Sequence, residues 1–135
     1  MAGTYGFELD LTTLNEEEIA FLAEETAFYK KYSGLVRTGD YYRLTDDKAR
    51  YMAWQFVSKD KKSSLAVLVQ KTNHIDYKPI IRRFEGLCPD TRYRVIIDGQ
   101  EREEVYSGTA LMQIGIRVGT IKYECESTRV ELIAE

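Results

Sequence analysis

The segment from Phe84 to Val95 restricts the possible folds of this chain more than any other segment. It reads Phe-Glu-Gly-Leu-Cys-Pro-Asp-Thr-Arg-Tyr-Arg-Val, which is the end of an apolar strand, a Gly-Leu-x-Pro turn and the start of a new strand. In the new strand Tyr93, Val95 and Ile97 point inward while Arg92 and Arg94 point outward, and a period of two is that of a strand with one buried face. The segment therefore predicts an antiparallel β-sandwich.

The length and net charge of the chain exclude several other classes of protein. A chain of 135 residues is the size of one domain with one core. No apolar run approaches the ~20 residues that cross a bilayer, and a net charge of −3 argues against a surface that binds nucleic acid. We therefore expect neither a membrane nor a nucleic acid among the partners of this chain.

The residues from Asn15 to about Leu35 form a predicted helix, because Asn15 can cap it with Glu18 reaching back. The apolar residues of this helix make two stripes, whereas a helix on a single core normally shows one. One stripe holds Ile19, Leu22, Ala23, Thr26 and Tyr29, and the other holds Phe21, Phe28, Tyr32 and Leu35. We expect the second stripe to form a surface for contact between domains or for self-association.

After Gly39 the pattern changes to alternation and short apolar runs. The polar run 59–62 and the dipeptide Asp98-Gly99 predict hairpin turns, and therefore antiparallel pairing. The predicted strands are Asp40–Leu44, Tyr51–Ser58, Ser64–Lys71, Ile80–Phe84, Arg92–Asp98, Glu103–Tyr106, Ile121–Cys125 and Arg129–Ile133, with one helical turn at Thr109–Gly115. The predicted fold is mainly β: an antiparallel β-sandwich of about eight strands over residues 39–135, preceded by a helical segment over residues 1–38.

The polar residues indicate no catalytic centre. Most acidic residues lie at the helix start, in turns or on the solvent-facing phase of strands, where we place Glu103 and Glu131. His74 is the only histidine, and one histidine does not make a metal site. We expect no catalytic residue, metal or cofactor. Two cysteines, Cys88 and Cys125, are too few for a disulfide scaffold, so we expect free thiols and a cytoplasmic location.

Aromatic residues leave two interpretations open. Flat rings stack on sugar rings, so a row of them on one sheet would form a carbohydrate-binding platform. Alternatively, the period of two in Met52, Trp54 and Phe56 is that of the buried phase of a strand. We favour the buried phase for Trp54. Tyr41 and Tyr42 are adjacent, so one of them must point away from the core.

Six segments of the chain, in this order, resemble the C-terminal region of the α-galactosidases of glycoside hydrolase family 36. The segments are Gly6–Leu11, Glu16–Tyr32, Gly39–Leu44, Trp54–Ser58, Gly86–Tyr93 and Tyr106–Gly115. The resemblance covers most of the chain up to about Lys122.

The resemblance implies that a (β/α)₈ barrel precedes this region and that residues from Asp10 to about Leu35 are the last helix of that barrel. It places the two catalytic aspartates in the barrel, so no catalytic residue carries over to this chain. It implies a non-catalytic accessory domain whose partner is the absent barrel, with homo-oligomer formation as a further expectation. A carbohydrate-binding module is the alternative, and an independent enzyme would need two carboxylates that converge in a cleft.

Overall fold

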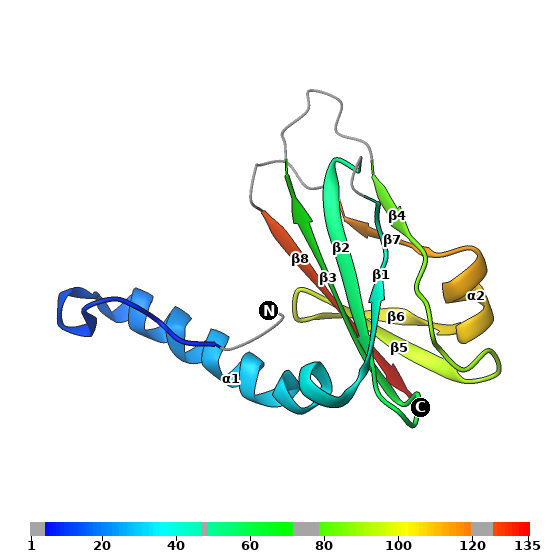
Figure 1. The fold of residues 1–135 in the computed structure, drawn as a ribbon, viewed down its shortest axis with the longest axis horizontal. Coiled ribbons are helices and arrows are strands. Elements are labelled where there is room, and N and C mark those ends of the chain that lie inside the picture. Colours follow the sequence, from blue (N-terminus) through cyan, green and yellow to red (C-terminus); the bar gives the residue numbers. More distant parts are fainter. Residues whose placement is uncertain (1–4, 47–48, 72–78, 120–125) are drawn as a thin grey trace.

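The computed structural model describes residues 5–46, 49–71, 79–119 and 126–135. Figure 1 shows one long helix leading into two antiparallel sheets. The elements are the 3₁₀ turn η1 (Leu11–Thr13), α1 (Glu16–Thr38), β1 (Asp40–Arg43), β2 (Tyr51–Val57), β3 (Ser63–Gln70), β4 (Ile80–Arg82), β5 (Arg92–Ile97), β6 (Gln100–Ser107), α2 (Gly108–Gln113), β7 (Ile116–Gly119) and β8 (Ser127–Ala134).

Helix α1 begins as its sequence predicts. The side chain of Asn15 accepts a hydrogen bond from the Glu18 amide at 2.9 Å, and the Glu18 carboxylate accepts one from the Asn15 amide at 2.9 Å. This capping box satisfies two donors that a helix start leaves unpaired. The helix runs to Thr38, three residues beyond the predicted end, and the Gly39 amide closes it on the Leu35 carbonyl at 2.8 Å. Its N-terminal half extends beyond the sheets (Figure 1).

Six strands form one sheet in the order β1-β2-β3-β8-β5-β6, and β4 pairs with β7 in a second sheet. All pairings are antiparallel, so the predicted fold class is confirmed. The sequence pattern missed β7, a four-residue strand that follows Gly115. The predicted strand Ile121–Cys125 lies outside the described residues.

The two predicted hairpin turns are confirmed. Asp98 and Gly99 have φ angles of 48° and 80° between β5 and β6, a conformation that the Asp-Gly dipeptide favours. The run 59–62 joins β2 to β3, with Lys61 at a φ of 61°. Tight turns keep neighbouring strands in register, and this register decides which side chains share a face of the sheet.

The main core fills the space on one face of the six-stranded sheet. Val57, Leu68, Tyr93 and Leu132 are inaccessible to solvent on that face, and Leu111 of α2 covers them from the other side together with β4 and β7. We call this face the inner face of the sheet. The inward phase of Tyr93 and Val95 is confirmed, because both side chains are fully buried.

One polar group in the main core is fully bonded. Gln55 is inaccessible to solvent, and its amide nitrogen donates to the Ser64 hydroxyl at 2.8 Å and to the Glu85 carbonyl at 3.0 Å. Its amide oxygen accepts from the Glu85 backbone at 2.8 Å. Buried polar groups are tolerated when they are bonded in this way, and these bonds tie β2 to the segment that follows β4.

Candidate functional site

The opposite face of the six-stranded sheet, which we call the helix-side face, carries α1. Phe28, Tyr32 and Leu35 of α1 pack on Leu65 and Val67 of β3, and Trp54 and Val69 border this cluster. The helix covers only part of the face, because α1 leaves the sheet towards its own N-terminus (Figure 1).

The strand phase predicted for Trp54 is wrong. Ala53, Gln55 and Val57 point to the inner face, so Met52, Trp54 and Phe56 point to the helix-side face. Alternation in β2 could not reveal this, because the strand is covered on both faces over part of its length and the inner face takes the small or polar residues Ala53 and Gln55. Trp54 is half-buried, and its indole nitrogen is buried without a hydrogen-bond partner among the described residues.

The assignment of Glu131 to a solvent-facing phase is also wrong, because α1 covers it and leaves it 4% exposed. The Tyr32 hydroxyl donates a hydrogen bond to its carboxylate, and the Lys31 ammonium lies 2.7 Å from the same oxygen. Burial, and then the neighbouring Glu131 carboxylate, raise the pKa of Tyr32 well above its usual value. Sequence reasoning could not pair these residues, since they are about one hundred positions apart.

Arg129 makes a second polar contact between β8 and α1. Its guanidinium pairs with the Glu25 carboxylate and lies over the Phe28 ring, 4.5 Å from the ring centre. Arg129 and Glu131 therefore bond to two successive parts of the helix. A buried charge must be paired to be tolerated, so these contacts specify where along the sheet the helix lies.

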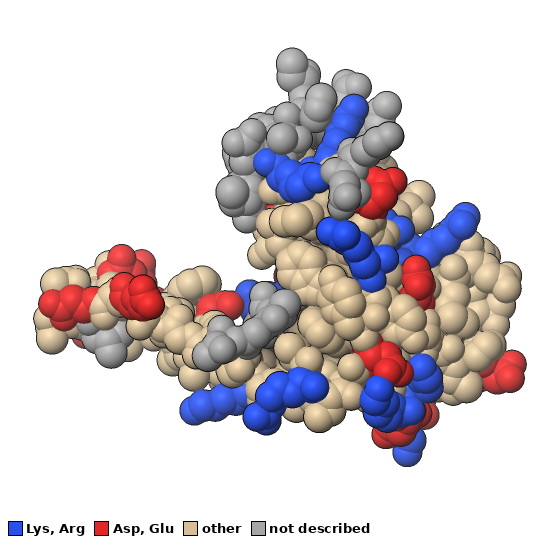
Figure 2. Space-filling view, viewed as in Figure 1, with Lys and Arg blue, Asp and Glu red and all other residues tan. Residues whose placement is uncertain are grey.

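The second stripe of the helix divides between two environments. Phe28, Tyr32 and Leu35 face the sheet of their own chain, whereas Phe21 is 60% exposed. Other apolar residues on the protruding part of α1 and the segment before it are also exposed: Phe7, Leu9 and Ile19 are each at least 40% exposed. Of these, Leu9 lines a shallow pocket together with Phe21. In Figure 2 acidic and uncharged side chains share the visible surface of this protruding part.

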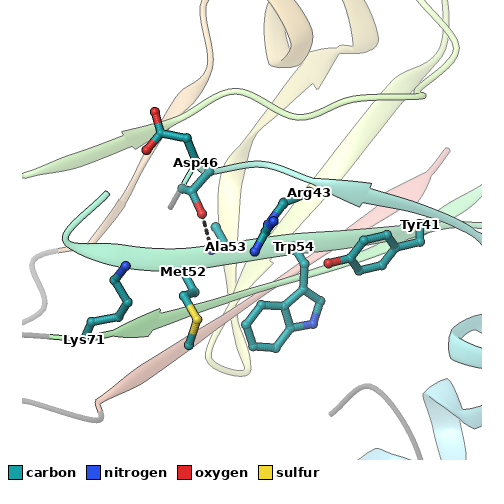
Figure 3. Close-up of a pocket in the computed structure, with 8 residues that line it drawn as sticks. Tyr41, Arg43, Asp46, Met52, Ala53, Trp54 and Lys71 are labelled. Carbon is teal, nitrogen blue, oxygen red and sulfur yellow. Dashed lines mark hydrogen bonds between the residues drawn. The ribbon is translucent and has the colours of Figure 1, made fainter. Parts of the chain in front are cut away.

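A pocket of about 180 Å³ lies where β1 and β2 leave the cover of the helix (Figure 3). We call it the β1–β2 pocket. It is lined by Tyr41, Arg43, Thr45, Asp46, Met52, Ala53, Trp54 and Lys71. Tyr41 and Met52 are 57% and 43% exposed, so the outward-pointing member of the tyrosine pair is Tyr41. In Figure 3 the Asp46 carboxylate points away from the aromatic side chains.

The described residues offer little for catalysis or metal binding. The β1–β2 pocket holds a single carboxylate, that of Asp46, whereas glycoside hydrolysis commonly needs two that face each other across the substrate. No group of three metal-ligating side chains occurs in the part of the chain that the structure describes, and His74 lies outside it. No helix in the described ranges is long and apolar enough to cross a bilayer.

Comparison with known proteins identifies the family. The family profile of the glycosyl hydrolase family 36 C-terminal domain matches residues 51–132. The chain belongs to this family. The match confirms the resemblance to family 36 that the sequence motifs of this C-terminal domain indicate.

The relatives of this family 36 domain are α-galactosidases. It is 34% identical over 128 residues to the bifunctional α-galactosidase/sucrose kinase AgaSK of Mediterraneibacter gnavus, covering 94% of this chain and 13% of the relative. It is 32% identical over 117 residues to the α-galactosidase AgaA of Geobacillus stearothermophilus, covering 86% of this chain and 15% of the relative. The chain thus spans a small part of the relatives it matches.

Solved structures agree. The crystal structure of AgaA from Geobacillus stearothermophilus superposes with a TM-score of 0.86 at 30% identity, covering 99% of this chain and 18% of that one. The galactosidase domain of AgaSK superposes with a TM-score of 0.83, covering 96% of this chain and 18% of that one. The superposed part includes α1 as well as the sandwich, because 99% coverage leaves almost no residue out.

Proposed function

We propose that this chain is a non-catalytic accessory domain of an α-galactosidase, an enzyme that hydrolyses terminal α-linked galactose. Residues 39–135 would form the accessory sandwich, and residues 1–38 would end the catalytic barrel. The chain spans only 13–15% of the α-galactosidases named above, which leaves ample length for a separate catalytic domain. The β1–β2 pocket, with its single carboxylate, also favours a non-catalytic role.

The observation that carries this proposal is the division of α1. Its C-terminal half is bound to the sandwich, and its N-terminal half presents Phe21 at 60% exposure, beside Leu9 at 44% in the same shallow pocket. Contiguous exposed apolar surface marks a site of protein contact. We infer that the catalytic barrel covers this end of the helix in the parent enzyme, so that α1 joins the two domains.

An activity assay tests the first part of the proposal. The isolated chain should not turn over a nitrophenyl α-galactoside, because the nucleophile and the acid would belong to the barrel. Turnover that survives repurification and is lost when a carboxylate of this chain is replaced would make the chain an enzyme and end the proposal.

A pair of helix variants tests the second part. In the isolated chain the exposed end of α1 should drive self-association, so Phe21→Ser should shift the population towards monomer without lowering stability. Phe28→Ser is the matched control: it removes a side chain that packs on the sheet, so it should lower stability instead. Light scattering and thermal unfolding separate the two effects. A wild-type chain that stays monomeric at high concentration would contradict a docking role for this surface.

We also propose a cytoplasmic location for the protein. Cys88 is a free thiol, which suits a reducing compartment. Fractionation of cells that produce the parent enzyme tests this, and recovery outside the cytoplasm would refute it.

A further inference from the structure

We propose that the β1–β2 corner of the helix-side face is a second contact surface for the same catalytic domain that covers the exposed end of α1. This corner comprises Tyr41, Met52 and Trp54 with the charged side chains around them. The inference rests on the proposed function and adds to it, because it assigns the domain contact to the sheet as well as to the helix.

The corner is continuous with an interface that is already present. Trp54 belongs both to the cluster under α1 and to the lining of the β1–β2 pocket, so the corner extends the buried helix–sheet contact without a gap. The seven residues of β2 give a strand of about 23 Å at ~3.3 Å per residue. One helix with a diameter of about 10 Å covers less than half of that length. The rest of the strand is long enough to contact another element of the catalytic domain.

The part of the helix-side face that α1 leaves uncovered exposes large side chains. Tyr41 and Met52 are 57% and 43% exposed on neighbouring strands, whereas Leu65 and Val67 on the same face are at most 5% exposed under the helix. Large aromatic and methionine side chains are enriched where protein surfaces meet. The side chains of the corner are therefore of the types found in protein interfaces, but they are exposed in this chain.

The corner also contains a hydrogen-bond donor without a partner among the described residues. The Trp54 indole nitrogen is buried and lacks an acceptor within the described chain, and such a group carries a free-energy penalty unless it finds a partner. In Figure 3 the Trp54 ring lies between the side chains of Met52 and Tyr41. A domain that packs on this corner and displaces the exposed Tyr41 side chain can bring a hydrogen-bond acceptor to the Trp54 indole nitrogen.

Hydroxyl-radical footprinting tests the inference by comparing the isolated chain, diluted until it is monomeric, with the parent enzyme. Sulfur and aromatic side chains react readily, so Met52 and Tyr41 report on the corner and Phe21 reports on the helix. All three should react several-fold more slowly in the parent enzyme. Ile114, which is 72% exposed on a different part of the sandwich, should react equally in both and serves as the control.

The pattern of protection separates the two proposals. If Phe21 is protected while Met52 and Tyr41 are not, the corner is not a contact surface and the inference is overturned, while the docking of α1 stands. If none of the three is protected, both proposals fail. Saturable change of the single indole N–H signal of Trp54 when raffinose is added to the isolated chain would also overturn the inference, in favour of a carbohydrate-binding platform.

A charge-insertion pair gives an independent measurement. Met52→Glu should lower the thermal stability of the parent enzyme but leave that of the isolated chain nearly unchanged, because the side chain is exposed until the domains meet. Ile114→Glu, an apolar-to-charged change at another exposed position, should leave both unchanged. Equal effects of Met52→Glu on the two proteins would contradict the inference.

Discussion

Both faces of the six-stranded sheet bury apolar side chains, but they are completed in different ways. The inner face is closed by elements of the sandwich itself, and its side chains, such as Leu68 and Leu132, are inaccessible to solvent. The helix-side face is closed only where α1 crosses it, and the contact there depends on charged groups, Arg129 and Glu131. The inner face can therefore hold the sandwich together alone, whereas the helix-side face is built to receive another element.

Replacing a leucine on each face should give the largest difference. Leu68→Ala removes a fully buried side chain from the inner face, so it should lower the free energy of unfolding by about 2–5 kcal/mol. Leu35→Ala acts on the half-buried helix contact and should cost about 1–2 kcal/mol, since less apolar area is lost. Urea unfolding of both variants measures this difference. Equal costs would mean that the helix-side face belongs to the main core.

The polar contacts of the helix-side face should account for a smaller effect that is confined to α1. Glu131→Ala leaves the Tyr32 hydroxyl and the Lys31 ammonium without their shared acceptor, so it should cost about 1–3 kcal/mol. Amide hydrogen exchange should accelerate in the C-terminal half of α1 and stay unchanged in the inner strands. Glu103→Ala, at an exposed position, should stay within about 0.5 kcal/mol of wild type. Unchanged exchange of α1 in Glu131→Ala would show that apolar packing alone holds the helix.

The smallest effect should appear as a dependence on pH. Burial and the Glu131 carboxylate raise the pKa of Tyr32, so above the unfolded-state value of about 10 the folded chain keeps a proton that the unfolded chain loses. Stability therefore falls as pH rises through about 10. Burial also raises the pKa of Tyr93, so Tyr32→Phe should remove only part of this fall, under about 1 kcal/mol between about pH 9.5 and 10.5. Parallel stability curves for wild type and Tyr32→Phe would contradict the prediction.

Local patterns could be read from the sequence because their causes are local. The capping box of Asn15 and Glu18, the Asp98-Gly99 turn and the alternation of Tyr93 and Val95 each depend on residues a few positions apart. The same holds for the antiparallel sandwich, which follows from tight turns between alternating strands. β7 is no shorter than β1, which was predicted. It was missed because Gly115 and Gly119 flank its three remaining residues, and glycines next to a short apolar run indicate turns.

The candidate site is different, because its residues meet only after folding. The helical pattern predicts one surface of Phe21, Phe28, Tyr32 and Leu35, and the structure places the last three on the chain's own sheet. Arg129 and Glu131 carry a signal in hindsight, since both occupy the same phase of β8. That phase is equally typical of a solvated strand face, so the pattern could not distinguish it from a face under a helix.

What the sequence alone determined was the fold class, the hairpin turns, the start of α1 and the resemblance to family 36. What only the tertiary structure decided was the direction of each β2 side chain and the burial of Glu131. Ala53 and Gln55 face the inner core while Trp54 faces the helix, which inverts the phase that side-chain size predicts. The physical reason is that β2 packs against other elements on both faces over part of its length. Alternation tells which residues share a face, but the packing partners, distant in sequence, decide which face becomes the core.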